Sequence, residues 1–125
     1  MVSRLRLIVV LGLASACGGG NGPSPMPPPQ TNPNVITITS AGVSPKQITV
    51  AIGSRVLFVN NDSRRHDMTS DDHPDHLECP ALNDVGLLQP GQQRESGNLV
   101  VARTCGYHDH DNPTTASLQG SVVIR

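Results

Sequence analysis

The stretch PKQITVAIGSRVLFVNND, residues 45–62, decides the fold class of this chain. Residues 47–52 alternate polar and apolar side chains, which places the apolar ones on one face of a strand. Gly53 marks a turn, and the valine- and phenylalanine-containing residues 55–59 then predict a second strand. Neither segment has a helical period, so the stretch predicts a β-sheet.

Similar short segments lie on both sides of this stretch. Residues 35–39 alternate in the same way, residues 87–92 indicate a strand edge running into a Pro-Gly turn, and residues 99–104 and 118–124 indicate two later strands. Residues 64–83 show no period and are dense in His, Asp and Pro, which predicts a loop. Several short strands separated by turns, without an internal repeat, predict an all-β antiparallel sandwich.

The N-terminus predicts export. Residues 1–16 combine Arg4 and Arg6 with a short apolar run and small residues, as a secretory signal peptide does, and the run is too short to span a membrane. Cys17, followed by three glycines, resembles the lipidated cysteine of a bacterial lipoprotein. An ordinary signal peptide with an incidental cysteine is the alternative. Residues 17–34, rich in Pro and Gly, then predict a spacer between lipid and domain. We therefore expect a lipid-anchored protein of the bacterial cell envelope.

Composition limits the function of the remaining segment, residues 35–125, whose length fits a single domain. Without Arg4 and Arg6 the chain has seven basic and ten acidic residues, a formal charge near −3. Phe58 and Tyr107 are the only aromatic residues, and no basic stripe is present, which excludes nucleic acid as a partner. No Ser-His-Asp spacing, phosphate loop or distinct carboxylate pair is found, so we expect a monomeric protein that is not an enzyme.

All five histidines lie in two clusters of the mature domain. The first contains His66, His73 and His76, and the second contains His108 and His110 directly after Cys105. Imidazole and thiolate are ligands that suit copper or zinc. Because histidines in loops are also common as solvated surface residues, this spacing alone leaves both interpretations open.

The order of these motifs resembles that of the cupredoxins, the plastocyanin-like blue-copper proteins. Residues 45–62 followed by His66 resemble the strand, glycine turn and strand that deliver the first histidine ligand in that family. Residues 88–92 resemble its Pro-Gly hairpin, residues 104–108 its cysteine and second histidine, and residues 118–124 its final strand. The resemblance covers nearly the whole domain and implies a Greek-key β-sandwich.

Carried over to this sequence, the resemblance implies that His66, Cys105 and His108 are the equatorial ligands of a type 1 copper site. Leu118 stands where the family usually supplies an axial Met, which implies a weak axial bond and a raised potential. The implied function is electron transfer with one copper ion, in exchange with a redox partner protein of the envelope.

Cys79 leaves other arrangements open. A Cys79–Cys105 disulfide would stabilise the domain by about 3–4 kcal/mol in the chain-entropy model but would consume the copper thiolate. The protein would then be a metal-free, disulfide-stapled interaction module. Alternatively, both cysteines and His108 could form a closed Zn²⁺ or Cu(I) site in a metal carrier. The fourth ligand would then be one of the remaining histidines, His66, His73, His76 or His110. His73 and His76, with the aspartates beside them, could also form a surface Cu(II) site.

Overall fold

The computed structural model describes residue 22 and residues 32–125. The predicted signal peptide (residues 1–16), Cys17 and most of the predicted 17–34 spacer lie outside these described residues. Within the described part of the chain, no helix has the length and apolar character needed to cross a membrane. The first strand begins at Val35, where the sequence predicts that the domain begins.

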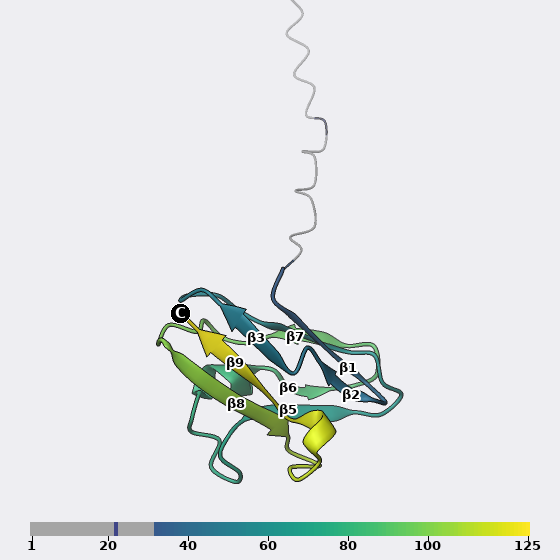
Figure 1. Cartoon of the computed structure of the whole chain (residues 1–125). Coiled ribbons are helices and arrows are strands. Elements are labelled where there is room, and N and C mark those ends of the chain that lie inside the picture. Colours follow the sequence, from purple (N-terminus) through teal and green to yellow (C-terminus); the bar gives the residue numbers. More distant parts are fainter. Residues whose placement is uncertain (1–21, 23–31) are drawn as a thin grey trace, which may run out of the picture. The chain divides into compact units, whose positions relative to one another are not determined.

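Two β-sheets make up the domain (Figure 1). The first has the strand order β2-β1-β4-β7, with bounds Gly42–Ser44, Val35–Thr39, Leu57–Asn60 and Gln93–Glu95. The second has the order β3-β9-β8-β5-β6, with bounds Gln47–Val50, Gly120–Ile124, Arg103–Asp109, His66–Ser70 and Gly86–Leu88. Two short 3₁₀ helices, η1 (Pro80–Asp84) and η2 (Ala116–Leu118), lie in the connections.

The predicted β-sandwich is confirmed, with one difference in strand direction. β1 pairs with β4 in parallel and β3 with β9 in parallel, whereas the other pairs are antiparallel. The chain passes from the first sheet to the second between β2 and β3 and returns before β4. Parallel neighbours arise because such crossings bring together strands that no tight hairpin connects. The sheets are therefore mixed rather than wholly antiparallel.

Aliphatic residues from both sheets fill the core, together with the two aromatic residues of the chain. Phe58 of β4 and Tyr107 of β8 are both buried, with an edge-to-face geometry and ring centroids 5.2 Å apart. Such pairs contribute beyond the area they bury. Burial also raises the pKa of the Tyr107 hydroxyl above its usual value. Since Phe58 and Tyr107 lie in different sheets, their contact joins the two layers of the sandwich.

Several segments differ from the sequence prediction. The strand expected over residues 118–124 begins at Gly120, because Ala116–Leu118 form η2, and β2 and β7 were not predicted. The sequence predicts a loop over residues 64–83, but His66–Ser70 form β5. The alternate burial of β5 is carried by His66, Met68 and Ser70, and a hydrophobicity pattern does not register buried polar residues. The strand expected over residues 99–104 begins only at Arg103, and the valines before it are exposed.

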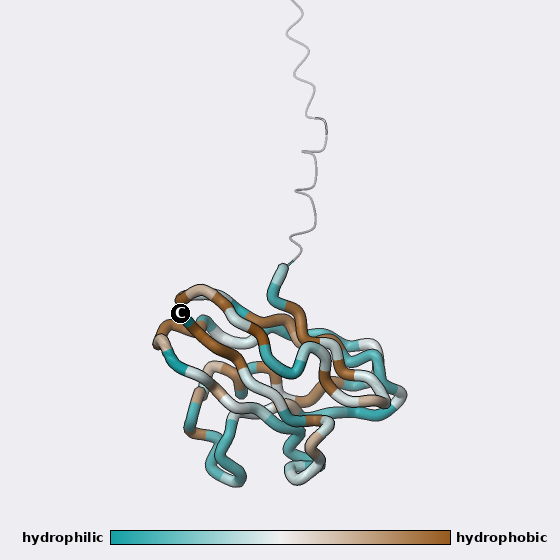
Figure 2. Tube along the Cα trace, in the orientation of Figure 1, coloured by the Kyte–Doolittle hydropathy of each residue, from teal (hydrophilic) through white to brown (hydrophobic). Residues whose placement is uncertain are grey.

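The fold brings the two histidine clusters together. β5 pairs antiparallel with β8, with Thr69 opposite His108. The segment after β5 (residues 71–79) and the segment after β8 (residues 110–115) project from the same side of the domain, at the bottom of Figure 1. Both segments carry polar residues, as the teal colour of Figure 2 shows.

Candidate metal centre

Four histidines form one group on this side of the domain. A ligand nitrogen from each of His73, His76, His108 and His110 lies within 4.8 Å of those of the others. His73 and His76 come from the segment after β5, and His108 and His110 from the end of β8 and the residue beyond it. Reduced hydration in the cluster, and then repulsion from the other three imidazoles, lower the pKa of His73 below its usual value. A neutral imidazole is the form that binds metals.

His108 has one ring nitrogen engaged and one free. Its Nδ1 lies 2.5 Å from Oδ1 of Asp71, so Nδ1 carries the proton and donates a hydrogen bond to the carboxylate. Its Nε2 is buried and has no hydrogen-bond partner among the residues that the structure describes. A buried polar atom without a partner is costly, and a carboxylate on the opposite nitrogen is the usual second-shell partner of a metal-bound histidine. His108 is therefore prepared to bind a metal through Nε2.

His76 is oriented in a similar way. Its Nδ1 donates to the Ser70 carbonyl over 2.7 Å, which leaves Nε2 as the unprotonated nitrogen, 2.9 Å from Nδ1 of His110. His76 has a φ of 55°, and no other non-glycine residue among those described has a positive φ. The Asn83 side chain donates to the His76 carbonyl and helps to hold this backbone. Strained backbone that neighbouring groups hold in place is a frequent feature of binding sites.

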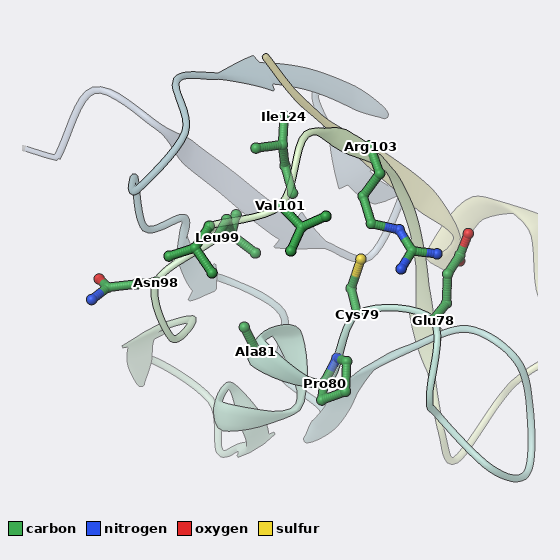
Figure 3. Close-up of a pocket in the computed structure, with 10 residues that line it drawn as sticks. Glu78, Cys79, Pro80, Ala81, Asn98, Leu99, Val101, Arg103 and Ile124 are labelled. Atoms are coloured by element: carbon green, nitrogen blue, oxygen red, sulfur yellow. The ribbon is translucent and has the colours of Figure 1, made fainter.

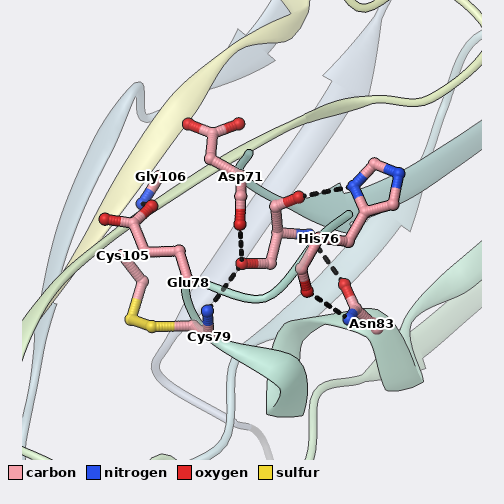
Figure 4. The surroundings of a disulfide bond; sticks show 8 residues. Asp71, His76, Glu78, Cys79, Asn83, Cys105 and Gly106 are labelled. Atoms are coloured by element: carbon pink, nitrogen blue, oxygen red, sulfur yellow. Dashed lines mark hydrogen bonds between the residues drawn. A yellow bond between two sulfur atoms is a disulfide. The ribbon is translucent and has the colours of Figure 1, made fainter. Parts of the chain in front are cut away.

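A disulfide anchors the segment that carries His73 and His76 (Figure 4). Cys79 and Cys105 are bonded, with their Cα atoms 5.8 Å apart. The Cys79 amide donates to Oγ of Ser70, and this hydroxyl donates to the Asp71 carbonyl. Since the Ser70 carbonyl accepts a hydrogen bond from His76, one buried serine connects the disulfide with the histidine cluster.

Gly106 leaves the space that Asp71 needs. A Cβ at this position would collide with the Asp71 carboxylate, which reaches across β8 to His108. The Gly106 amide also donates to the Glu78 carboxylate over 2.9 Å. The absence of a side chain at residue 106 therefore allows the Asp71–His108 contact.

His66 has a different environment. It is fully buried, with Nδ1 2.9 Å from Oδ2 of Asp109 and Nε2 3.0 Å from Oδ2 of Asp62. Each ring nitrogen of His66 therefore has a carboxylate as its hydrogen-bond partner, and neither nitrogen is left for a metal. The hydrogen bond from His66 is the main cause that lowers the pKa of Asp62. Burial acts to raise the pKa of Asp109, but the bond from His66, helped by Asn112 and two backbone amides, outweighs it and lowers that pKa.

The structure does not bring His66, Cys105 and His108 together as a ligand set, which corrects what the resemblance implied. The carboxylates occupy both nitrogens of His66, and the sulfur of Cys105 is bonded to Cys79 and offers no thiolate. Leu118 is buried in the core and supplies no donor atom. The disulfide is one of the alternatives that the sequence left open. It also rules out the closed Zn²⁺ or Cu(I) site with both cysteines as ligands.

The cluster joins His108 to the three histidines that the sequence offered only as alternatives, His73, His76 and His110. No sequence signal assigned Ser70, Asp62 or Asp109 to the site, and Asp71 was expected only as one of the aspartates beside a surface Cu(II) site of His73 and His76. The density of aspartates around the histidines was the available signal. It did not indicate which carboxylate would contact which ring, because that depends on the pairing of β5 with β8.

The donor set fits a copper or zinc ion. Metal–nitrogen bonds of about 2.0–2.1 Å place two nitrogens of one ion at most about 4.2 Å apart, so small side-chain movements would suffice for binding. His108 Nε2 and His76 Nε2 already have the required tautomers, and a bound metal would take the place of the hydrogen bond between His76 and His110. Imidazole nitrogen suits both metals, and Cu(II) is the divalent ion that nitrogen sites bind most strongly.

Solved structures similar to this domain share its fold. No protein-family model matches the chain, and no curated protein matches it as a relative. A purple cupredoxin from Nitrosopumilus maritimus is 19% identical, with a TM-score of 0.56 over 73% of this chain and 98% of that chain. The oxidised plastocyanin from Dryopteris crassirhizoma is 15% identical, with a TM-score of 0.56 over 73% and 99% of the two chains.

A Cu(I) form of an amicyanin variant is 20% identical, with a TM-score of 0.53 over 73% of this chain and 80% of that chain. At these identities the likeness concerns the fold. The predicted cupredoxin-like architecture is thereby confirmed, and the domain that carries the histidine cluster has the cupredoxin fold.

Proposed function

We propose that this protein binds one copper ion at His73, His76, His108 and His110 and serves in electron transfer. The observation that carries the proposal is the cluster of four imidazoles, two of which, His76 and His108, have second-shell groups that fix their tautomers. The fold supports copper over zinc, since one of the similar solved structures is described as a Cu(I) protein. Zinc remains the competing ion in any binding experiment.

The chain contributes nitrogen ligands and the groups that orient them. Asp71 holds the proton of His108 at Nδ1, and the Ser70 carbonyl holds that of His76 at Nδ1. A copper ion held there would supply a one-electron redox centre. The site has no thiolate, so it differs from the type 1 site that the resemblance implied.

The scaffold supports electron transfer because it restrains the ligands. His108 belongs to β8, which pairs with both β5 and β9, and the Cys79–Cys105 bond holds the segment of His76 against β8. Ligands that move little between oxidation states lower the reorganisation that each electron transfer requires. His73 is exposed and would give a redox partner access to the site.

The same proposal includes the place of the protein in the cell. With the predicted signal peptide and a lipid on Cys17, the domain would be held at a membrane of the bacterial envelope and would meet its redox partner there. Mass spectrometry of the purified protein would test this directly, because a lipidated N-terminal Cys17 has a distinct mass. An unmodified residue at position 17 would remove the anchor from the proposal.

Copper titration tests the binding site. We expect the wild-type protein to bind one equivalent of Cu(II), and His108→Ala and His76→Asn to lose at least about 100-fold in affinity, since each loses a ligand. Asn is chosen at position 76 because it tolerates a positive φ. Leu77→Ala, in the same segment and exposed, is the matched control and should bind as the wild type does. Equal affinity in all four proteins would contradict the proposed site.

Voltammetry separates electron transfer from metal carriage. An electron-transfer site is expected to show a reversible one-electron couple and to retain copper in the presence of a competing chelator in both oxidation states. Release of the ion on reduction would instead favour a carrier.

A further inference from the structure

A second surface of the domain exposes apolar side chains that no other described part of the chain covers. Ile52, Val100 and Val101 are 56%, 64% and 60% exposed, and we call these three residues the valine face. They come from two adjacent segments, because the amide of Gly53 donates to the Leu99 carbonyl and Ser54 pairs with Leu99. Figure 2 shows brown segments gathered at the edge of the domain that bears the C-terminus.

A small apolar pocket extends this face inward. It has a volume of about 170 Å³, and Leu99, Val100, Val101 and Ile124 are among its lining residues. Figure 3 shows the Val101 side chain within the pocket region, between Ile124 and Cys79. The exposed valines are therefore continuous with buried apolar surface, unlike isolated apolar residues on a polar surface, which need no explanation.

Positive charges surround the valine face. Arg103 lines the same pocket, and the amide of Arg125 bonds to Val50, beside Ile52. Arg55 follows the turn that carries Ile52 and donates to Asn98. All three arginines are exposed. Of the nearby acids, Glu95 pairs with Arg55, Glu78 accepts the Gly106 amide, and Asp72 and Asp75 line a second pocket with Arg103. Apolar side chains bordered by arginines are typical of surfaces that bind anionic lipid bilayers.

The chain enters the domain next to this face. The side chains of Asn32 and Asn34 both donate to the Arg55 carbonyl, and the Asn34 carbonyl accepts the Leu57 amide. Fourteen residues separate Asn32 from Cys17, which carries the proposed lipid, and even fully extended they reach only about 50 Å. A tether of this length raises the local concentration of bilayer around the domain, so a weak contact suffices.

We infer that the valine face rests on an anionic lipid bilayer. Ile52, Val100 and Val101 would enter the interface between headgroups and acyl chains, and the three arginines would contact lipid phosphates. The inference rests on the lipid anchor proposed above but not on the metal in the cluster.

Tryptophan fluorescence tests the contact directly, because the natural chain contains no tryptophan. Val101→Trp places the single probe on the valine face, and Leu77→Trp places it at an equally exposed apolar position in the segment of the histidine cluster. The full-length, lipidated chains would be bound to vesicles of phosphatidylglycerol and phosphatidylcholine that contain brominated lipid. We expect a blue shift and at least twofold quenching for Val101→Trp, and neither effect for Leu77→Trp.

The charges and the anchor have their own controls. Quenching should decrease in vesicles of phosphatidylcholine alone and in high salt, because the arginines lose their attraction to the lipid. Flotation of Cys17→Ala with vesicles reports the anchor separately, and copper titration of the same samples reports the metal site. Equal quenching at both positions, quenching at position 77 only, or no association of the chain with vesicles would overturn the inference.

Discussion

Two buried histidines on neighbouring strands differ in how many of their ring nitrogens are engaged. His66 on β5 has a carboxylate at each nitrogen, whereas His108 on β8 has a carboxylate at one nitrogen and nothing at the other. The first arrangement makes His66 part of the core, and the second leaves Nε2 of His108 open to the metal that we propose. Burial and a nearby acid therefore do not distinguish a structural histidine from one that is available to bind a metal. The distinguishing feature is whether the second ring nitrogen has a hydrogen-bond partner.

The largest change in the free energy of unfolding is expected from removing the His66 ring. His66→Ala leaves Asp62 and Asp109 buried without their shared hydrogen-bond partner, which should destabilise the domain by about 3–5 kcal/mol. Urea unfolding followed by circular dichroism measures this loss. Copper affinity of the folded protein should remain within about threefold of the wild type, because His66 has no free nitrogen.

Should His66→Ala fail to fold, Asp62→Asn weakens only one side of this group and can replace it. A loss of copper binding in either folded variant, with stability retained, would show that His66 is a ligand after all.

The disulfide offers the next test. Cys79→Ala removes the bridge and should cost about 3–4 kcal/mol of stability in the chain-entropy model. It also frees the Cys105 thiol, the group that a type 1 site requires. We expect no intense thiolate-to-copper absorption in this variant, because the carboxylates still hold His66. A blue or green band would mean that His66, Cys105 and His108 can come together once the bridge is absent.

Asp71 should influence the metal far more than the fold. Asp71→Asn weakens the hold on the His108 proton, and second-shell changes of this kind typically lower metal affinity by about 10–100-fold. Stability should change by less than about 1 kcal/mol, since the carboxylate is partly exposed and contributes as a near-surface pair. Asp75→Asn, in the same segment, serves as the matched control in a copper competition titration. Equal affinities in the two variants would remove Asp71 from the site.

The smallest expected effect is a loss of stability of the metal-free protein as the pH falls. The folded structure lowers the pKa of Asp62 and of Asp109, so both carboxylates bind protons less readily than they do in the unfolded chain. Their contribution is fully present above about pH 4 and is lost as the pH falls through the lowered pKa values. Thermal unfolding between pH 6 and pH 3 should show this decrease, and Asp62→Asn should show less of it. An identical decrease in the variant would contradict the role of Asp62.

The sequence predicted the β-sandwich well because its signals are local. Residues 35–39 and 47–50 form strands where alternation placed them, and the order of the motifs matched the cupredoxin fold. β5 escaped prediction because two of its three buried residues, His66 and Ser70, are polar and find their partners elsewhere in the chain.

The candidate site was predicted in its residue types but not in its grouping. All four histidines of the cluster were named, yet only the pairing of β5 with β8 determines that His108 lies with His73 and His76 rather than with His66. Whether Cys105 is free also depends on the distance to Cys79, which no local pattern encodes. Contacts between residues far apart in sequence decide both outcomes.

X-ray absorption at the copper edge tests the central claim most directly. With one equivalent of Cu(II) bound to the wild-type protein, the account predicts nitrogen scatterers at about 2.0 Å with the outer-shell pattern of several imidazoles, reduced in His108→Ala. A short copper–sulfur distance, or a nitrogen shell that is unchanged in His108→Ala, would contradict it.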